Sequence, residues 1–409
     1  MGVKGLDSVI KTYAGDSIKK KEFKSYNGTI QSIDASVNLY KFCIAIMNTD
    51  NFKSPTGDVI GHLFACLYKS SSMLKYGIMP LWTFDGAPPS IKQSTLNDRR
   101  KIRESAALKL SESPSMDIKD KIKFEKRKFT VTSAYIREIK YLLKLMGLPF
   151  IESPGEAEAQ CTAFEIANIS NGVVTEDWDV ILFGCKKMLK DFSNKSYVTE
   201  IDVNEMMKSL GMNREQLINF GAILGTDYCV GIGGLKAVDA FIKFRACNFN
   251  IDTFITMLHQ ENLHLNKYKY KIPKNFIDQL KSSHDYYLHA PVIDPKEIKI
   301  IWTEPNYKKL YSYLIENKKF KADITQAKIY ELEIMYKRYV TNDNKLITMS
   351  RIKKEQYEMK YSNDMKYSNH MKYSNHMKYS NEYYNVSHEI NCVNYLLEII
   401  QCKKINIAT

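Results

Sequence analysis

The sequence predicts an α/β protein in which a mostly parallel central sheet is flanked by helices. Three apolar stretches, residues 29–34, 79–85 and 172–177, each end in a carboxylate and are typical of buried strands. Helical patterns lie between them, and in residues 133–146 apolar side chains recur at spacings of three and four. Strands that alternate with helices favour a parallel sheet with covered faces. Ligands of such sheets gather beyond the carboxyl ends of the strands, where these acids are expected.

Two regions depart from this alternation. Residues 90–128 are basic with few apolar positions, and Ser-Glu-Ser-Pro-Ser interrupts them at 111–115, so we expect two helices and a turn that stand away from the core. From residue 341 the chain is polar, and the hexapeptide Met-Lys-Tyr-Ser-Asn-Asp/His/Glu occurs four times between Met359 and Glu382. A unit this short builds neither a helical solenoid nor a core. We therefore expect a disordered low-complexity tail, with one short helix near residues 392–401.

Charge and composition narrow the class of protein. The formal net charge of +13 favours a polyanionic partner, because neutralising phosphates releases counterions, although solubility alone explains it equally well. No apolar run approaches the roughly 20 residues of a membrane-spanning helix, and the N-terminus lacks a signal-peptide pattern. Leu6 stands where a myristoylation signal requires Ser or Thr. Eight scattered cysteines form no Cys-x-x-Cys pair, so we expect a soluble intracellular protein with reduced thiols.

Seven acids are the candidate functional residues. Singly, each has a structural explanation as a helix cap, a turn residue or a favourable charge at a helix N-terminus. Together on converging strands they would repel one another unless cations neutralise them. Ligand sets made only of oxygen select Mg²⁺ or Mn²⁺, and two such ions clamp the attacking and leaving oxygens of a phosphodiester. The seven are Asp34, Asp85, Glu156, Glu158, Asp177, Asp179 and Asp227.

The segments that carry these acids resemble the signature motifs of flap endonucleases, which are structure-specific 5' nucleases of the XPG/Rad2 type. In order they are Met-Gly-Val-Lys-Gly-Leu at 1–6, Ile-Asp-Ala-Ser at 33–36, Phe-Asp-Gly-Ala-Pro-Pro at 84–89, Pro-Gly-Glu-Ala-Glu-Ala at 154–159, Thr-Glu-Asp-Trp-Asp at 175–179 and Leu-Gly-Thr-Asp-Tyr at 224–228. Further similarity at 145–149 and 302–306 extends the match to about residue 340. The order and spacing make this signal far more specific than any one motif.

The resemblance implies a PIN-like nuclease core with a helical gateway and a helix-two-turn-helix DNA-binding element. It divides the chain into an N-terminal nuclease region at 1–104, a gateway at 90–128, an internal nuclease region at 122–253 with the helix-two-turn-helix near 220–245, the remaining core at 254–340 and the tail at 341–409. It also implies 5'-flap endonuclease and 5'-3' exonuclease activity in flap removal, Okazaki fragment maturation and long-patch base excision repair.

Metal and catalytic roles follow from the same resemblance. Asp34, Asp85, Glu156 and Glu158 would serve one Mg²⁺, and Asp177, Asp179 and Asp227 a second, with Mn²⁺ as a substitute. Lys92 and Arg99 match basic gateway residues that steer and polarise the target phosphate. A solvated basic helix face explains the same spacing.

DNA contacts are implied at Tyr40, which matches a base-stacking aromatic, and at Lys69 and Arg103. Glu156, Asp227, Gly225, Gly231 and Gly233 complete the implied DNA-binding set. The glycines lie at or near the hairpin of the helix-two-turn-helix, where the family often binds K⁺. The alternatives are an ordinary helix-face tyrosine and a plain glycine turn, and Met47 replaces one basic residue of the family.

The implied partner is DNA with a 5' flap, nick or gap, and we expect a monomer without membrane contact. Family members carry a clamp-binding box of glutamine, an aliphatic residue and two aromatics near the C-terminus, and the sequence has none. Sliding-clamp binding is therefore implied by the resemblance alone, as is location in the nucleus of a eukaryotic host, with the nucleolus or mitochondrion as further sites. The alternatives are a relative specialised for long resection or four-way junctions, and a non-catalytic DNA-binding scaffold.

Overall fold

The computed structural model describes residues 2–49, 51–113, 116–194, 197–264 and 269–339. All of them belong to the first of two units into which the chain divides, Met1–Thr348. The predicted tail, its repeats and the helix near residues 392–401 lie outside the described residues. Within the described ranges, no helix has the length and apolar composition that a membrane span requires.

A seven-stranded sheet forms the centre of the described structure, in the order β1-β7-β6-β5-β2-β3-β4. Strands β6, β5, β2, β3 and β4 run parallel, while β7 pairs antiparallel with both β6 and β1. The predicted mostly parallel α/β architecture is therefore confirmed. The strands are β1 (Ile18–Lys21), β2 (Ile30–Asp34), β3 (Met79–Phe84), β4 (Phe150–Glu152), β5 (Val173–Val174), β6 (Lys187–Lys190) and β7 (Val198–Asp202).

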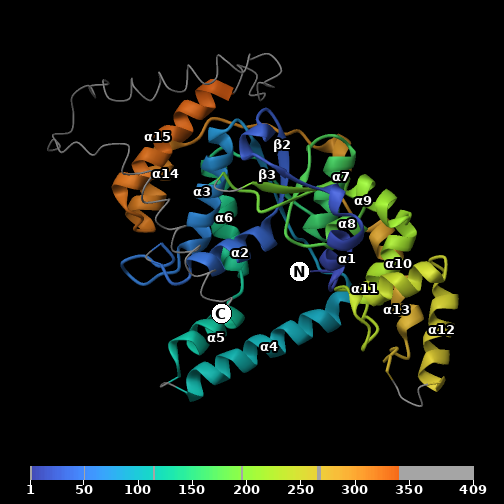
Figure 1. Cartoon of the computed structure of the whole chain (residues 1–409). Coiled ribbons are helices and arrows are strands. Elements are labelled where there is room, and N and C mark those ends of the chain that lie inside the picture. The colour runs from blue at the N-terminus through green and yellow to red at the C-terminus, as the bar shows by residue number, and fades with distance from the viewer. Residues whose placement is uncertain (1, 50, 114–115, 195–196, 265–268, 340–409) are drawn as a thin grey trace, which may run out of the picture. The chain divides into compact units, whose positions relative to one another are not determined.

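Helices cover the sheet, and further helices lie beside it (Figure 1). The α-helices are α1 (Leu6–Tyr13), α2 (Ala35–Ile46), α3 (Gly61–Lys75), α4 (Gln93–Glu112), α5 (Ile118–Lys128), α6 (Ser133–Leu145), α7 (Ala157–Ile166), α8 (Asp179–Leu182), α9 (Val203–Leu210), α10 (Arg214–Leu224), α11 (Ala237–Ala246), α12 (Ile251–His264), α13 (Phe276–His289), α14 (Tyr307–Tyr311) and α15 (Ala322–Tyr339). Short 3₁₀ or π turns are η1 (Gly15–Ser17), η2 (Phe23–Tyr26), η3 (Ser90–Lys92), η4 (Pro295–Glu297) and η5 (Ser312–Asn317).

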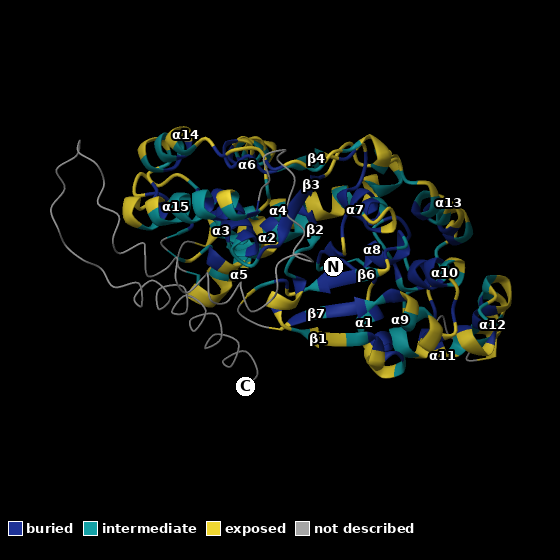
Figure 2. Cartoon of the chain, turned by 90° about the horizontal axis from the view of Figure 1, so that it is seen from above, coloured by how far each residue is buried: buried dark blue, intermediate teal, exposed yellow. Residues whose placement is uncertain are grey.

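The inner strands and one face of α6 form the buried core. All six residues of β3 are buried, as expected for a parallel strand with helices on both faces. Figure 2 shows the same contrast, with the inner strands mostly dark blue and the outer helices a mixture of teal and yellow. The helix predicted over residues 133–146 is α6, whose Ile139, Leu142 and Leu143 are fully buried. The predicted 3.6-residue periodicity therefore identified a core-facing helix correctly.

Helices α4 and α5 correspond to the two helices predicted over residues 90–128. They pack against each other and stand off the sheet in Figure 1. Ala106 is the only buried residue in α4, and α5 has none. The few apolar positions of this segment explain its placement, because it has too little apolar surface to bury against the core.

Six of the eight cysteines lie in the described residues, and all six are buried free thiols: Cys43, Cys66, Cys161, Cys185, Cys229 and Cys247. Burial raises the pKa of Cys43 and of Cys229 to about 12, and raises the pKa of the other four as well. These thiols therefore remain protonated and unreactive near neutral pH. The prediction of reduced core thiols is confirmed for them, while Cys392 and Cys402 lie outside the described residues.

Candidate active site

The carboxyl ends of four neighbouring parallel strands deliver most of the predicted acids. Asp34 is the last residue of β2, and Asp85 directly follows β3. Asp34 is level with Thr83 on β3, and Phe84 is level with Glu152 on β4, so these strand ends meet at one edge of the sheet. Glu156, the N-cap residue of α7, and Glu158 in its first turn follow β4, and the acids in residues 177–179 follow β5. The prediction that strands present acids at one edge is correct.

Hydrogen bonds from neighbouring elements fix the orientation of the first two carboxylates. Asp34 caps α2, because its Oδ1 accepts from the backbone N–H of Val37 at 3.2 Å, and its Oδ2 accepts from the Thr175 hydroxyl at 2.9 Å. Asp85 accepts from the Ser36 hydroxyl and, through Oδ1, from the backbone N–H of Ala157 at 2.9 Å. Asp34 therefore serves as the helix cap that its sequence suggested and faces the other acids as well.

Two glycines allow the chain to pass close to these carboxylates. A Cβ on Gly86 would lie 2.1 Å from the carbonyl oxygen of Ser153, so only glycine permits this crossing beside Asp85. A Cβ on Gly2 would lie 1.9 Å from Oδ1 of Asp177 and 2.9 Å from the backbone N of Asp179. The segment near the N-terminus thus packs directly against the second group of acids.

Burial and mutual repulsion raise the pKa of several of these groups. Burial, followed by the charge of Asp85, raises the pKa of Asp34 to about 8. Burial, with the charges of Asp177 and Asp34, raises the pKa of Glu158 well above its usual value. Burial also raises the pKa of Asp179, which in addition feels Asp177 and Asp227. Acids that are distant in the sequence therefore share one electrostatic environment.

Lys92 and Arg99 supply positive charge to this cluster. The Lys92 ammonium lies 2.6 Å from Oε2 of Glu156 and 3.4 Å from Oδ2 of Asp227, and its side chain is only 12% exposed. Arg99 Nη2 lies 2.6 Å from Oδ1 of Asp227, and the Thr95 hydroxyl donates to the Asp227 carbonyl at 2.8 Å. The first half of α4 and the turn before it are therefore attached to the acids by three side chains.

No three histidine, cysteine, aspartate or glutamate side chains among the described residues are arranged to hold a metal ion as they stand. The chemistry of the cluster nevertheless fits a hard divalent cation, because its donors are carboxylate oxygens. Oδ1 of Asp179 is buried without a hydrogen-bond partner in the described structure, which is costly for an acceptor unless a cation or donor binds there. A divalent ion would also relieve the repulsion that raises the pKa of these acids.

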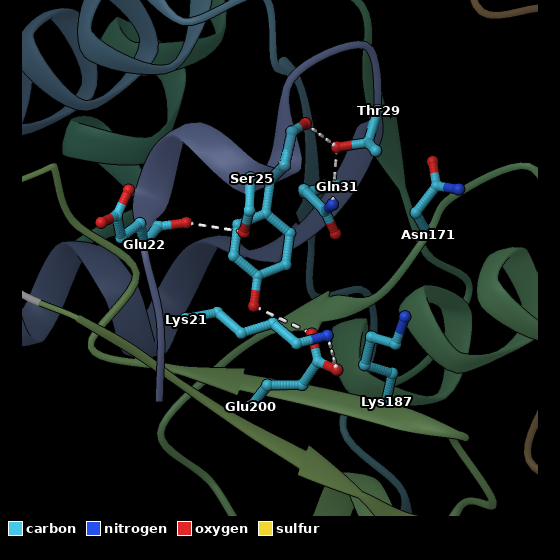
Figure 3. A pocket seen from close by; sticks show the side chains of 9 residues that line it. Lys21, Glu22, Ser25, Thr29, Gln31, Asn171, Lys187 and Glu200 are labelled. Carbon is cyan, nitrogen blue, oxygen red and sulfur yellow. Dashed lines mark hydrogen bonds and ion pairs between the residues drawn. The ribbon is translucent and has the colours of Figure 1, made fainter. Parts of the chain in front are cut away.

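A hollow of about 500 Å³ lies at the amino ends of the parallel strands, opposite the acids (Figure 3). Gln31 near the start of β2 and Lys187 at the start of β6 line it. Glu200 accepts from Lys21 at 2.8 Å and from the Tyr26 hydroxyl at 2.9 Å, so its charge is already compensated. None of the seven acids lines this hollow, and we assign it no part in the chemistry.

Comparison with known proteins identifies the family. Residues 1–106 match the XPG N-terminal domain, and residues 147–227 match the XPG I-region. Human flap endonuclease 1 is 31% identical over 341 residues, which cover 81% of this chain and 86% of the human protein. The chain belongs to the XPG/Rad2 family of 5' nucleases. It is therefore a structure-specific nuclease, a hydrolase acting on DNA, as the sequence motifs predicted.

Solved structures of XPG/Rad2 proteins share its fold. Flap endonuclease-1 from Methanococcus jannaschii is similar with a TM-score of 0.60 at 24% identity, covering 78% of this chain and 96% of that one. The Holliday junction-resolving enzyme GEN1, in complex with product DNA and Mg²⁺, has a TM-score of 0.55 at 20% identity, covering 81% of this chain and 77% of that one. That GEN1 structure contains Mg²⁺, which is the kind of hard cation that carboxylate oxygens select.

In this XPG/Rad2 chain, the predicted base-stacking residue Tyr40 is half-buried on α2. Its hydroxyl donates to the carbonyl of Lys126 at 3.4 Å, and its ring lies 6.0 Å from that of Phe129. Tyr40 therefore links α2, which Asp34 caps, to the end of α5. Arg103 lies on α4, one helical turn beyond Arg99. Their DNA contacts remain predictions.

Lys69, the other predicted DNA contact, points inward. Its ammonium donates to the carbonyl of Phe192 at 3.1 Å and lies 5.8 Å from the centre of that ring. Burial, with the nearby charge of Lys41, lowers the pKa of Lys69 to about 8. A phosphate contact would require this side chain to leave its present partner.

The three predicted DNA-binding glycines occupy crowded backbone positions between α10 and α11. Gly225 has φ +98°, and a Cβ on Gly231 would lie 2.5 Å from the carbonyl oxygen of Leu224. The N–H of Gly233 donates to the carbonyl of Lys271 at 3.0 Å, so it is already bonded within the protein. Gly225 is thus required by its backbone conformation and Gly231 by close packing, whereas contact of the three glycines with duplex phosphates, and with K⁺, remains a prediction.

Several residues that hold the acids were not predicted from the sequence. Ser36 and Thr175 bond directly to Asp85 and Asp34, yet in the sequence each stands out only as part of a motif. Lys41, Glu176 and Asp191 form an ion network beside the second group of acids. The adjacency of Glu176 to Asp177 was an available signal, whereas nothing in the sequence connected Lys41 to Asp191.

The raised pKa values predict a pH-dependent stability that metal ions reverse. Carboxyl groups of the unfolded chain titrate near pH 4, whereas Asp34 in the metal-free folded protein titrates at about 8. The folded state then binds more protons than the unfolded state, so the free energy of unfolding falls as pH rises through this window. Because Mg²⁺ requires ionised carboxylates, its stabilising effect should grow over the same window. Thermal unfolding with and without Mg²⁺ checks this, and an equal Mg²⁺ shift at both ends of the window would contradict it.

Proposed function

We propose that this XPG/Rad2 nuclease is a 5'-flap endonuclease with 5'-3' exonuclease activity that hydrolyses phosphodiesters with two Mg²⁺ ions per subunit. The observation that carries the proposal is the meeting of the acid cluster with the gateway. Lys92, directly before α4, and Arg99, in its first half, make ion pairs with Glu156 and Asp227, so this end of α4 adjoins the acids. A strand held at the gateway would therefore present its backbone to them.

The proposed roles follow from charge and placement. When bound, the ions would activate water and stabilise the leaving oxygen, which is the chemistry that paired divalent ions supply. Asp34, Asp85, Glu156 and Glu158 would hold one ion, and Asp177, Asp179 and Asp227 the other. Lys92 and Arg99 would turn from the carboxylates to the target phosphate, where fixed cations offset developing negative charge. Tyr40, which lies on the helix that Asp34 caps, would stack on the base next to the target phosphate.

Flap cleavage is favoured over junction resolution by the segment between Asp85 and Glu156. The described residues of that segment form η3, α4, α5, α6 and β4, and the sequence between the two acids lacks the large insertion typical of some relatives. The resolving enzyme GEN1 shares the fold at 20% identity, so junction cleavage is the competing activity within the family. The human relative at 31% identity is a flap endonuclease.

Cleavage of labelled substrates with and without Mg²⁺ tests the proposal. We expect the purified protein to cut a 5' flap at the junction with duplex, to shorten a nicked duplex from its 5' end, and to leave a four-way junction largely intact. Preferential resolution of the junction would replace the proposed activity with that of the GEN1 type. Absence of Mg²⁺-dependent cleavage on every substrate would leave only a DNA-binding scaffold.

Calcium is expected to support binding without turnover. Ca²⁺ accepts the same carboxylate oxygens but with longer bonds and more flexible geometry than Mg²⁺. It should therefore allow flap DNA to bind while failing to align the reacting phosphate. Fluorescence anisotropy measures binding, and gel assays measure cleavage under the same conditions. Comparable turnover in Ca²⁺ and Mg²⁺ would contradict the proposed site.

The cellular setting is inferred from relatives. We expect roles in Okazaki fragment maturation and long-patch base excision repair, in the nucleus if the host is eukaryotic. Mn²⁺ should replace Mg²⁺, and K⁺ is expected at the helix-two-turn-helix. Sliding-clamp binding rests on family resemblance, since the sequence lacks the clamp-binding box. We expect the protein to act as a monomer.

A further inference from the structure

Thr175, Glu176 and Trp178 are each tied to a neighbouring element, and the loop that they form carries Asp177 and leads to Asp179. The backbone N–H of Thr175 donates to Leu189 of β6 at 3.3 Å. The next residue, Glu176, accepts through Oε1 from the Lys41 ammonium at 2.6 Å and from the backbone N–H of Asp191 at 2.9 Å. The loop is therefore held in place on the side that faces β6 and α2.

Lys41 closes the network. Its ammonium also lies 2.8 Å from Oδ1 of Asp191, so a single cation bridges the loop after β5 and the loop after β6. Asp191 has φ +51°, a left-handed conformation that is unfavourable for a residue with a side chain and persists only where the surroundings hold it. Lys41 itself lies on α2, seven residues beyond the cap residue Asp34. One lysine thus connects the helix of the first acid to the loop of the second group.

A cation–π contact holds the middle of the same loop. The Lys190 ammonium lies 4.2 Å from the ring centre of Trp178, which stands between Asp177 and Asp179 and is 7% exposed. Lys190 and Asp191 are consecutive, so the end of β6 contacts the acid-bearing loop through two successive side chains. The loop is fixed both through its backbone and through the side chains that flank its acids.

We propose that Lys41, acting through Glu176 and Asp191, is a positioning residue that sets the spacing between the two groups of metal-binding acids. The proposal rests on the proposed two-metal function. Lys41 touches none of the seven acids; it acts on Asp177 and Asp179 through Glu176, the residue directly before them. Without this bridge the loop would retain its fold but hold the second pair of carboxylates less firmly against Asp34.

A half-exposed ion pair adds little to global stability, and Lys41 is 49% exposed. Its effect should therefore appear in metal affinity rather than in the unfolding temperature. Residues that orient metal ligands from behind typically change affinity by about 10- to 100-fold when removed. Because this network is partly solvated, we expect the lower end of that range.

The test compares Lys41→Met with wild type by two measurements. The Mg²⁺ concentration for half-maximal flap cleavage should rise about tenfold, with kcat at saturating Mg²⁺ little changed. Calorimetric titration of the protein–flap DNA complex with Ca²⁺, which involves no turnover, should show a matching loss of affinity. Lys41→Arg should restore most of the affinity, since arginine also pairs with two carboxylates. In a double-mutant cycle, Glu176→Gln and Lys41→Met should be strongly non-additive.

Lys337→Met is the matched control, because Lys337 makes an ion pair of the same 2.6 Å length with Glu333 on α15, a helix that packs against α3 and α14. It should behave as wild type in every measurement. Unchanged Ca²⁺ affinity in Lys41→Met would overturn the proposal, and so would a change confined to DNA affinity. If wild type cuts no substrate, the proposed function fails, while the Ca²⁺ titrations still report on the role of Lys41.

Discussion

Replacing Asp179 by asparagine is expected to abolish cleavage while leaving flap DNA binding intact. The side chain is 3% exposed, its Oδ1 has no hydrogen-bond partner in the described structure, and burial raises its pKa well above the usual value. The substitution is nearly isosteric but weakens one ligand of the second ion. Because such ions supply several kcal/mol of transition-state stabilisation, we expect a loss of about 10³-fold or more in single-turnover rate.

The stability of the metal-free Asp179→Asn protein shows whether a loss of cleavage comes from misfolding. Asp179→Asn removes a buried carboxyl whose ionised form is disfavoured by burial and by the charges of Asp177 and Asp227, so the metal-free protein should be at least as stable as wild type. Asp34 is a poorer choice, because it also caps α2 and its loss would disturb that helix. An Asp179→Asn enzyme that cleaves at the wild-type rate would refute the assigned metal site.

The second large effect is expected at Lys92. Lys92→Met should lower the cleavage rate by about 10²- to 10³-fold, because a fixed cation beside the reacting phosphate is lost. Without Mg²⁺ the variant should also be destabilised, since the ammonium that lies 2.6 Å from Glu156 and 3.4 Å from Asp227 no longer offsets their charges. Mg²⁺ should recover much of the stability but little of the rate.

Lys101→Met is the matched control on the same helix. Lys101 is 76% exposed and its nearest carboxylate is 3.9 Å away, so its loss should leave the unfolding temperature and the rate constant unchanged. Rapid-quench kinetics and thermal unfolding at low and high Mg²⁺ distinguish the two contributions of Lys92. A Lys92→Met enzyme with a normal rate would show that this lysine only balances the charge of the acids.

Much of this site was predictable because each of its strands is an apolar run that ends in an acid, a pattern visible in the sequence. Each apolar run that ends in an acid became a parallel strand or its end, and the parallel register of β2 and β3 then brought Asp34 and Asp85 to one edge. The basic, apolar-poor segment became α4 and α5 because it had little surface to bury. Motif order linked the remaining acids to the same place.

Contacts between side chains were not predictable in the same way. That Lys69 points toward the Phe192 carbonyl, or that Lys41 bridges Glu176 and Asp191, depends on how loops pack after the sheet has formed. Those loops have no periodicity, and their ion pairs join residues more than a hundred positions apart, such as Lys41 and Glu176. Sequence patterns therefore located the acids but not the residues that orient them.

The six protonated core thiols provide an internal reporter of local opening. Cys161 lies on α7, three residues beyond Glu158, and is fully buried. A maleimide or iodoacetamide can therefore modify it only in molecules whose acid-bearing helix has transiently separated from the sheet. Mass spectrometry of timed alkylation would follow that breathing motion residue by residue. Such labelling needs no introduced probe. It would show directly how far divalent ions or DNA lower the rate at which α7 opens.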